Sequence, residues 1–350
     1  MMRKCFRSLH ASISLILAAC LLCFCITGCT SKDNIMKPYT PMGDTKEADA
    51  TAEFSYTNDI DKPVKRVDGV SGNTIFIKDD SEYDTSEITA GQALLVNLTN
   101  GEVILSKQAL TAIPAGNFTK LFAAYVVFSE EDDLSRTISI SQDTNNLSSN
   151  LVRCKFQKDD TYKIEDLLYA SLMYCANDAV IALALGHPGG SISSFVKNMN
   201  ALSEDLNLKS TEFSNIYGYP VNGSKQETTL LDVFTVTREM IEKYPTFTEI
   251  ISKQVYFCTY QNSKSEPLSV NWNSALPYYN TEENYALPEH LNLELIGGIC
   301  EPASSAPTQI CCVFRDYYGT MYLALLAGCT SYEHCYEQMQ YLVTRIPAIY

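Results

Sequence analysis

The chain has 350 residues, which is enough for one large domain or two ordinary ones, and 46% of them are hydrophobic. With 19% charged residues, this composition excludes a chain that is disordered throughout. The formal net charge of −15, without any basic stripe, argues against nucleic acid or an anionic lipid surface as a partner.

The first 29 residues are predicted to be an export signal. Three basic residues precede a 14-residue apolar run, Ile13–Ile26, which has the length of a signal-peptide core and is short for a membrane span. The run leads into ITGC, and small residues before a cysteine resemble a bacterial lipobox, which implies cleavage and a lipid on Cys29. The alternative is an uncleaved anchor over Leu9–Gly28. Both interpretations place the rest of the chain outside the cytoplasmic membrane.

Residues 30–91 are polar and acidic, and they are predicted to be a tether in which NTIFIKD is a candidate short strand. Organised sequence is expected over residues 92–350. There, ALLVNL and VILSK flank Asn100-Gly101, which is a strong signal for a β-hairpin.

A block of helices is predicted to follow. One opens within residues 112–128 and carries Lys120 in its first turn. Others cover residues 164–186, 191–206 and 228–242, and the first of these breaks around Cys175-Ala176-Asn177, where Asn177 is the predicted N-cap.

Three strand-like runs, residues 293–300, 309–315 and 321–326, and a helix over 331–345 complete the chain. Strands, then helices, then strands make an α+β layout. We expect one domain with two lobes, in which the first hairpin and the last three strands form one antiparallel sheet and the helical block is an excursion from it.

Residues 93–343 resemble the serine-type D-alanyl-D-alanine carboxypeptidases, the low-molecular-mass penicillin-binding proteins that trim peptidoglycan stem peptides. The segments that carry the resemblance are AGQALLVNLTNGEVILSKQA, PAGNFTKLFAA, LLYASLMYCANDAVIALA, and FVKNMNALSEDLNLKSTEFSN followed by YGYP. The resemblance implies a β-lactamase/transpeptidase-like fold, an antiparallel sheet flanked by helices with a helical lobe, and no cofactor or metal.

The family's chemistry uses three motifs. A serine at a helix N-terminus attacks the scissile carbonyl, and a lysine three residues later holds its proton. A second serine, in Ser-x-Asn, relays protons. A Lys-Thr-Gly strand binds the substrate carboxylate, and backbone N–H groups stabilise the oxyanion.

This sequence retains the framework of those motifs but loses most of their chemical groups. Asn117 stands at the nucleophile position, while Lys120 is kept. In the second motif Cys175 replaces the serine, while Asn177 is kept. The third motif is predicted in LIGGICEPASS, where its three positions become Ile299, Cys300 and Glu301. The next residue, Pro302, has no N–H for an oxyanion.

The reductions in turnover caused by losing separate catalytic groups multiply where their effects are independent. In subtilisin, removing the nucleophile costs about 10⁶ in turnover, and losing one oxyanion donor costs roughly 10²–10³. We therefore predict a non-catalytic member of the family that binds a peptidoglycan stem peptide or an envelope protein. One alternative is an active carboxypeptidase that uses Thr119 or Ser106 as its nucleophile. Another is a structural envelope lipoprotein without a ligand.

The retained polar residues leave further alternatives. Lys120 and Asn177 either hydrogen bond to neighbouring amides or contact a ligand. Cys175 packs in place of a serine, acts as a thiol nucleophile near Lys120, or forms a disulfide with Cys300 across the cleft. The histidines His187, His290 and His334 are predicted to occupy surface or loop positions.

Overall fold

The computed structural model describes most of the chain from residue 65 onwards. The described residues are 65–68, 74–141, 144, 147, 151–218, 225–279, 287, 289–300 and 308–347. They all belong to one compact unit, Thr51–Tyr350. The predicted signal of residues 1–29, Glu301 and Pro302 lie outside the described residues.

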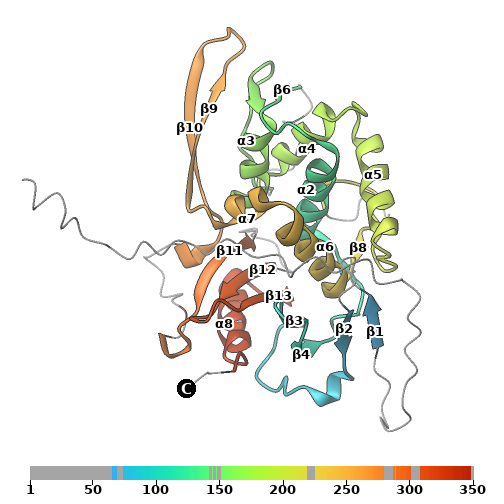
Figure 1. The fold of residues 1–350 in the computed structure, drawn as a ribbon. Coiled ribbons are helices and arrows are strands. Elements are labelled where there is room, and N and C mark those ends of the chain that lie inside the picture. The colour runs from blue at the N-terminus through green and yellow to red at the C-terminus, as the bar shows by residue number, and fades with distance from the viewer. Residues whose placement is uncertain are drawn as a thin grey trace, which may run out of the picture. The chain divides into compact units, whose positions relative to one another are not determined.

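A five-stranded antiparallel sheet joins the two ends of the described chain (Figure 1). Its strand order is β11-β12-β13-β3-β4. The strands are β3 (Gln92–Asn97), β4 (Val103–Lys107), β11 (Glu294–Cys300), β12 (Thr308–Arg315) and β13 (Met321–Cys329). The prediction that the first hairpin and the last three strands share one sheet is confirmed.

The two faces of this sheet belong to two separate hydrophobic cores. Successive side chains of a strand point to opposite faces, so Cys311 and Val313 join one core, while Ile310, Cys312 and Phe314 join the other. The first core also contains the helical block. The second contains helix α8 (Tyr332–Val343), which lies beside β12 and β13 in Figure 1.

The helical block lies between β4 and β11 in the sequence and matches the predicted excursion. Its helices are α2 (Thr119–Glu130), α3 (Ile164–Leu168), α4 (Asn177–Gly186), α5 (Ile192–Asp205), α6 (Leu230–Lys243) and α7 (Pro245–Ser252). A π-helical turn, η4 (Tyr169–Met173), separates α3 from the break before α4. Helices α5, α6 and α8 each begin after a capping residue whose hydroxyl oxygen accepts a hydrogen bond from a backbone N–H of the first turn. These capping residues are Ser191, Thr229 and Ser331 respectively.

A second antiparallel sheet was not predicted. Its order is β10-β9-β7-β6, from β6 (Thr137–Ser139), β7 (Thr161–Lys163), β9 (Val255–Gln261) and β10 (Pro267–Asn273). In Figure 1, β9 and β10 form a long ribbon beside the helical block. Trp272 on β10 is buried and packs edge-on against Phe156, which anchors this hairpin to the block.

Packed structure also occurs N-terminal to residue 92. Strands β1 (Lys65–Asp68) and β2 (Thr74–Ile77) pair with each other, and Ile75 and Ile77 are buried in the core that contains α2. The alternation of those two isoleucines explains their inward orientation.

Shorter elements connect the larger ones. They are η1 (Asp80–Glu82), β5 (Ile113–Pro114), η2 (Gly116–Phe118), β8 (Glu227–Thr228), η5 (Pro277–Tyr279) and η6 (Glu289–Leu291). Over the described part of the chain, none of the helices combines the length and apolarity required to span a membrane.

Candidate functional site

The first motif lies where η2 runs into α2. Gly116 has a φ of +50°, and its N–H donates to the Gly218 carbonyl oxygen at 2.7 Å. A Cβ on Gly218, whose φ is +82°, would meet that Gly116 carbonyl oxygen at 1.8 Å. This close backbone approach fixes the turn that carries Asn117 and, one helical turn later, Lys120. Both side chains are buried, with 3% and 2% of their surface exposed.

Asn117 is held against strand β12 by a residue that sequence reasoning missed. Its Nδ2 donates to the Gln309 backbone oxygen at 3.2 Å, and the Gln309 Nε2 donates to the Pro114 oxygen at 2.7 Å. Asn117 Oδ1 and Gln309 Oε1 are buried and have no hydrogen-bond partner among the described residues. The only signal for Gln309 in the sequence is one polar residue in the otherwise apolar run QICCVF.

The second motif lies at the predicted break between helices. Cys175 has a φ of +61°, and its thiol donates to the Cys300 backbone oxygen at 2.9 Å. The prediction that Asn177 is the N-cap of α4 is wrong, because Asn177 is the first helical residue and Ala176 precedes it. The N–H and Nδ2 of Asn177 instead donate to the Val152 oxygen, at 2.8 and 3.3 Å.

The third motif position is at the end of β11. Ile299 pairs with Cys311 and Cys300 pairs with Ile310, so this strand is tightly joined to β12. Ile299 points into the core of the helical block, whereas the Cys300 side chain points to the α8 face of the sheet. The Cys175 thiol therefore meets the backbone of Cys300 rather than its sulfur, and both cysteines are thiols in the structure.

The structure brings the three motif regions together. The turn η2 contacts β12, and the π-helical turn η4 contacts β11, the strand paired with β12. The neighbourhood that the motif alignment assigns is therefore assembled. The side chains at its positions in the described part of the chain are the amides of Asn117 and Asn177, the Lys120 side chain, a thiol directed at a carbonyl oxygen, and an isoleucine.

The two alternative nucleophiles have other roles in packing. Thr119 is 1% exposed, and its hydroxyl accepts a hydrogen bond from Gln226 Nε2 at 3.4 Å. Ser106 is fully buried on β4, at the opposite edge of the sheet from β11, and it donates to Asp80 Oδ1 at 3.4 Å. Ser106 is thus separated from the third motif by three strands.

Burial shapes the acid–base properties around the site. Burial raises the pKa of the Cys311 thiol to about 12, with Thr237 opposing the shift through a hydrogen bond. Burial also raises the pKa of Asp178, the second residue of α4, although the N–H groups of Cys154 and Lys155 donate to its carboxylate at 3.0 and 2.7 Å. At neutral pH the Cys311 thiol is protonated and is no nucleophile.

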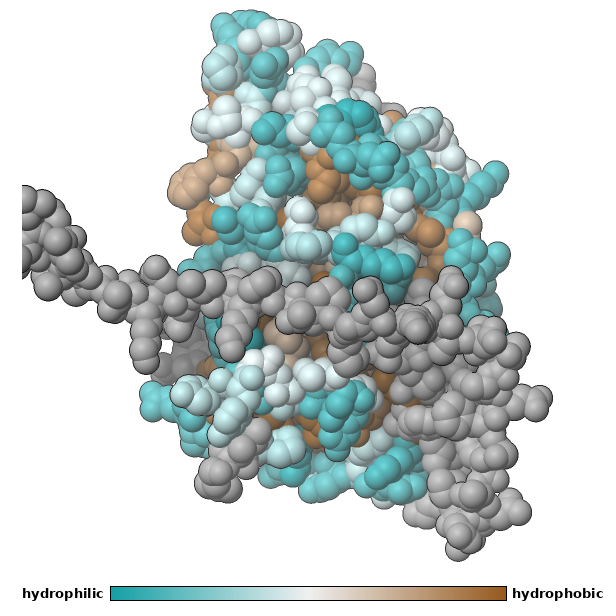
Figure 2. All heavy atoms as spheres, viewed as in Figure 1, coloured by the Kyte–Doolittle hydropathy of each residue, from teal (hydrophilic) through white to brown (hydrophobic). Residues whose placement is uncertain are grey.

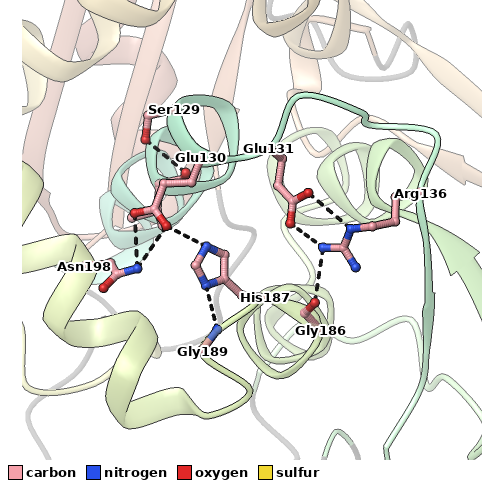
Figure 3. Close-up of polar contacts among 9 residues, drawn as sticks. Ser129, Glu130, Glu131, Arg136, Gly186, His187, Gly189 and Asn198 are labelled. Atoms are coloured by element: carbon pink, nitrogen blue, oxygen red, sulfur yellow. Dashed lines mark hydrogen bonds and ion pairs between the residues drawn. The ribbon is translucent and has the colours of Figure 1, made fainter.

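The histidines occupy surface or loop positions as predicted. His290 is exposed in η6, and His187 lies in the loop after α4, where it is buried and 2.9 Å from Glu130 through Nε2 and Oε2 (Figure 3). The other ring nitrogen, Nδ1, accepts the Gly189 N–H at 3.5 Å, and Asn198 Nδ2 donates to Glu130. His187 thereby connects the ends of α2, α4 and α5 and takes part in packing rather than in a triad.

His334 is in the first turn of α8. Its Nε2 is 2.7 Å from the Thr89 hydroxyl and its Nδ1 accepts the Thr330 N–H at 3.0 Å. The side chain joins α8 to the segment that enters β3.

A pocket lies away from the motif positions. It has a volume of 310 Å³ and is lined by residues of α6 and of the turn after α5, among them Leu208, Lys209, Asp232 and Thr235. Figure 2 shows hydrophilic side chains over much of the face in view, interrupted by separate hydrophobic patches.

The antiparallel sheet, with helices on both faces and a helical block inserted between its strands, is the β-lactamase/transpeptidase-like fold. Among solved structures, the Streptomyces K15 DD-transpeptidase matches with a TM-score of 0.65 at 18% identity, covering 74% of this chain and 97% of that one. Penicillin-binding protein D2 of Listeria monocytogenes matches with a TM-score of 0.58 at 19% identity over the same shares. At these identities the likeness shows the fold.

Sequence comparison then gives the family. The D-alanyl-D-alanine carboxypeptidase family model matches residues 79–281, more than half of the chain, and the chain belongs to this family. A D-alanyl-D-alanine endopeptidase of Escherichia coli is 26% identical over 54% of this chain and 62% of its own length. D-alanyl-D-alanine carboxypeptidase DacD of the same organism is 28% identical over 48% of this chain and 45% of its own.

An endopeptidase of Pseudomonas aeruginosa is 30% identical over 36% of this chain and 40% of its own length. The matched regions thus span about 40–62% of the curated relatives.

Proposed function

We propose that this chain is a non-catalytic member of the family, attached by a lipid on Cys29 outside the cytoplasmic membrane. There it binds a peptidoglycan stem peptide or an envelope protein. The observation that carries this proposal is Asn117, which occupies the nucleophile position and is 3% exposed. A carboxamide has neither the hydroxyl nor the thiol from which an acyl-enzyme forms.

The contacts around Asn117 support the same conclusion. Its amide donates to β12, and Gln309 packs beside it, so the side chain at the i−3 position from Lys120 is a carboxamide engaged with the sheet rather than a hydroxyl. The thiol of Cys175 is directed at the Cys300 oxygen, where it cannot relay a proton to a substrate. Thr119 and Ser106 are buried in contacts away from the motif geometry.

The burial of Lys120 and Asn177 also bears on where a partner binds. Each is 2% exposed, so a ligand could reach them only after the surrounding side chains moved. This favours recognition through the outer surface of the domain.

Fluorescent penicillin tests the loss of acyl chemistry. Membranes from cells that express the full chain are incubated with the probe and separated on a denaturing gel, with Escherichia coli DacD as a positive control. We expect labelling of DacD and no band for this chain. A band that disappears in Lys120→Ala would show an active acylating site and would refute the proposal.

An Asn117→Ser variant tests whether the nucleophile alone is missing or whether the carboxylate clamp and the oxyanion donor are missing as well. We expect labelling to stay below roughly 1% of the control, because the carboxylate clamp and the oxyanion donor each contribute about 10² or more. Labelling near that of DacD would mean that the nucleophile alone was missing.

The lipid is tested separately. The full chain should incorporate labelled palmitate and fractionate with membranes, whereas Cys29→Ser should do neither. Membrane attachment without palmitate would favour the alternative in which residues Leu9–Gly28 form an uncleaved membrane anchor.

A further inference from the structure

Two cysteines that the site does not use lie against each other on the α8 face of the sheet. Cys329 is the last residue of β13 and Cys335 is in the first turn of α8. Both are thiols in the structure, and their sulfur atoms are 2.6 Å apart. This distance lies between the covalent sulfur–sulfur distance of about 2.05 Å and the optimal separation of unbonded carbon atoms, about 3.5 Å.

The local backbone explains why these two residues meet. Gly328, with a φ of +71°, turns the chain at the end of β13, and Ser331 then caps α8 by accepting the His334 N–H. The turn is fixed independently of the sulfur atoms, so the two side chains are pre-aligned. Both cysteines are buried, with 1% and 0% of their surface exposed.

We propose that Cys329 and Cys335 form a disulfide in the exported protein, tying α8 to the sheet. The inference goes beyond the proposed function and uses only its location outside the cytoplasm, where disulfides persist. The two thiols lose two protons and two electrons. A disulfide of a thiol–disulfide oxidoreductase accepts the electrons, through a mixed disulfide that the second thiolate resolves.

The environment of Cys335 indicates when the disulfide would form relative to folding. Contact with Cys329 and burial raise the pKa of Cys335 far above its ordinary value, so little thiolate is present once the core has formed. Because both side chains are also buried in the folded protein, we expect the bond to form while the chain folds, before α8 covers the sheet.

Two further pairs that are close in the fold or in sequence differ from this one. The Cys175 thiol meets a backbone oxygen of Cys300, and Cys311 and Cys312 point to opposite faces of the sheet. We therefore expect one disulfide and six thiols among the eight cysteines that follow Cys29.

The test uses the full exported chain, denatured in an alkylating agent with and without prior reduction, followed by peptide mass mapping. Without reduction, the peptides of Cys329 and Cys335 should be linked and the other six cysteines alkylated. Cys335→Ser should make Cys329 alkylated without reduction, whereas the control Cys311→Ser should leave the link intact. Alkylation of both Cys329 and Cys335 without reduction would overturn the proposal.

A thermal melt gives an independent readout. Closing this short loop predicts that a reducing agent lowers the Tm by roughly 5 °C in the wild type and not in the double variant Cys329→Ser/Cys335→Ser. An equal shift in both would contradict a bond between these residues.

Refolding of the purified full chain in a glutathione buffer tests whether Cys329 and Cys335 can pair, independently of where the protein is located in the cell. Thiols at both positions after refolding would refute the pair itself. A bond formed in the buffer and never in cells would refute the disulfide in the exported protein while leaving the pairing geometry intact, and neither outcome bears on the penicillin experiment.

Discussion

The two faces of the five-stranded sheet carry similar apolar side chains but contact different parts of the protein. One face packs against α6 and the helical block, and its edge meets the motif positions Asn117 and Lys120. The other packs against α8 and contains the Cys329–Cys335 pair. Both are continuous apolar cores, and of the third-motif positions Ile299 belongs to the first and Cys300 to the second.

The comparison separates what folding requires from what acyl transfer requires. A core position needs an apolar side chain of suitable volume, and many residues satisfy that requirement. A nucleophile, a proton relay and a carboxylate clamp each need a particular atom at a particular place. The face at the motif site is packed like the other, and the function proposed above assigns it none of those atoms.

The largest expected effects test whether both faces are packed alike. Leu325 and Leu326 are neighbours on β13, are fully buried, and point into the two different cores. Replacing either with alanine should lower the free energy of unfolding by about 2–5 kcal/mol. Urea unfolding measures both values. A loss below about 1 kcal/mol for Leu325→Ala alone would show that the face beside the motif site is loosely packed.

The next effect concerns the backbone at the motif site. A Cβ on Gly218 would overlap the Gly116 oxygen, so Gly218→Ala should destabilise the protein by about 2–4 kcal/mol. Gly190 has a φ of +60° and open space around it, so the matched Gly190→Ala should cost only about 1 kcal/mol of backbone strain. Equal losses in thermal or urea unfolding would mean that the close approach at the site does not contribute to stability.

The smallest expected effect is a pH dependence. Burial raises the pKa of Asp178 above its ordinary value of 3.8. Its stabilising contribution is therefore full below that value and is lost as the pH rises through the folded pKa. The stability of Asp178→Asn relative to the wild type should increase with pH across this window, in urea unfolding at a series of pH values.

Asp133 provides the control of opposite sign. Hydrogen bonds from Ser135 lower its pKa, so its contribution is present above 3.8 and is lost as the pH falls. The stability of Asp133→Asn relative to the wild type should therefore decrease as the pH rises through that range. The same sign for both variants would contradict this account.

Much of the fold could be predicted from the sequence. Asn100-Gly101 between two apolar runs marked the hairpin, and the last strands and α8 lie close to their predicted ranges. The hairpin of β9 and β10 was missed because its outward side chains are uncharged and include the exposed Phe257, so apolar and polar residues do not alternate clearly. Asn177 was assigned as a cap because its side chain suits that role, but a contact with the distant Val152 decided its position.

The sequence by itself determined the family framework and the spacing of Asn117 three residues before Lys120, because those follow from residue identity and order. Tertiary structure alone decided which atoms meet. It placed Gln309 beside Asn117, turned Cys300 away from Cys175, and brought Cys329 to Cys335. The physical reason is that strand register and the two-residue alternation assign each side chain to a face, and packing between elements distant in sequence then selects its neighbours.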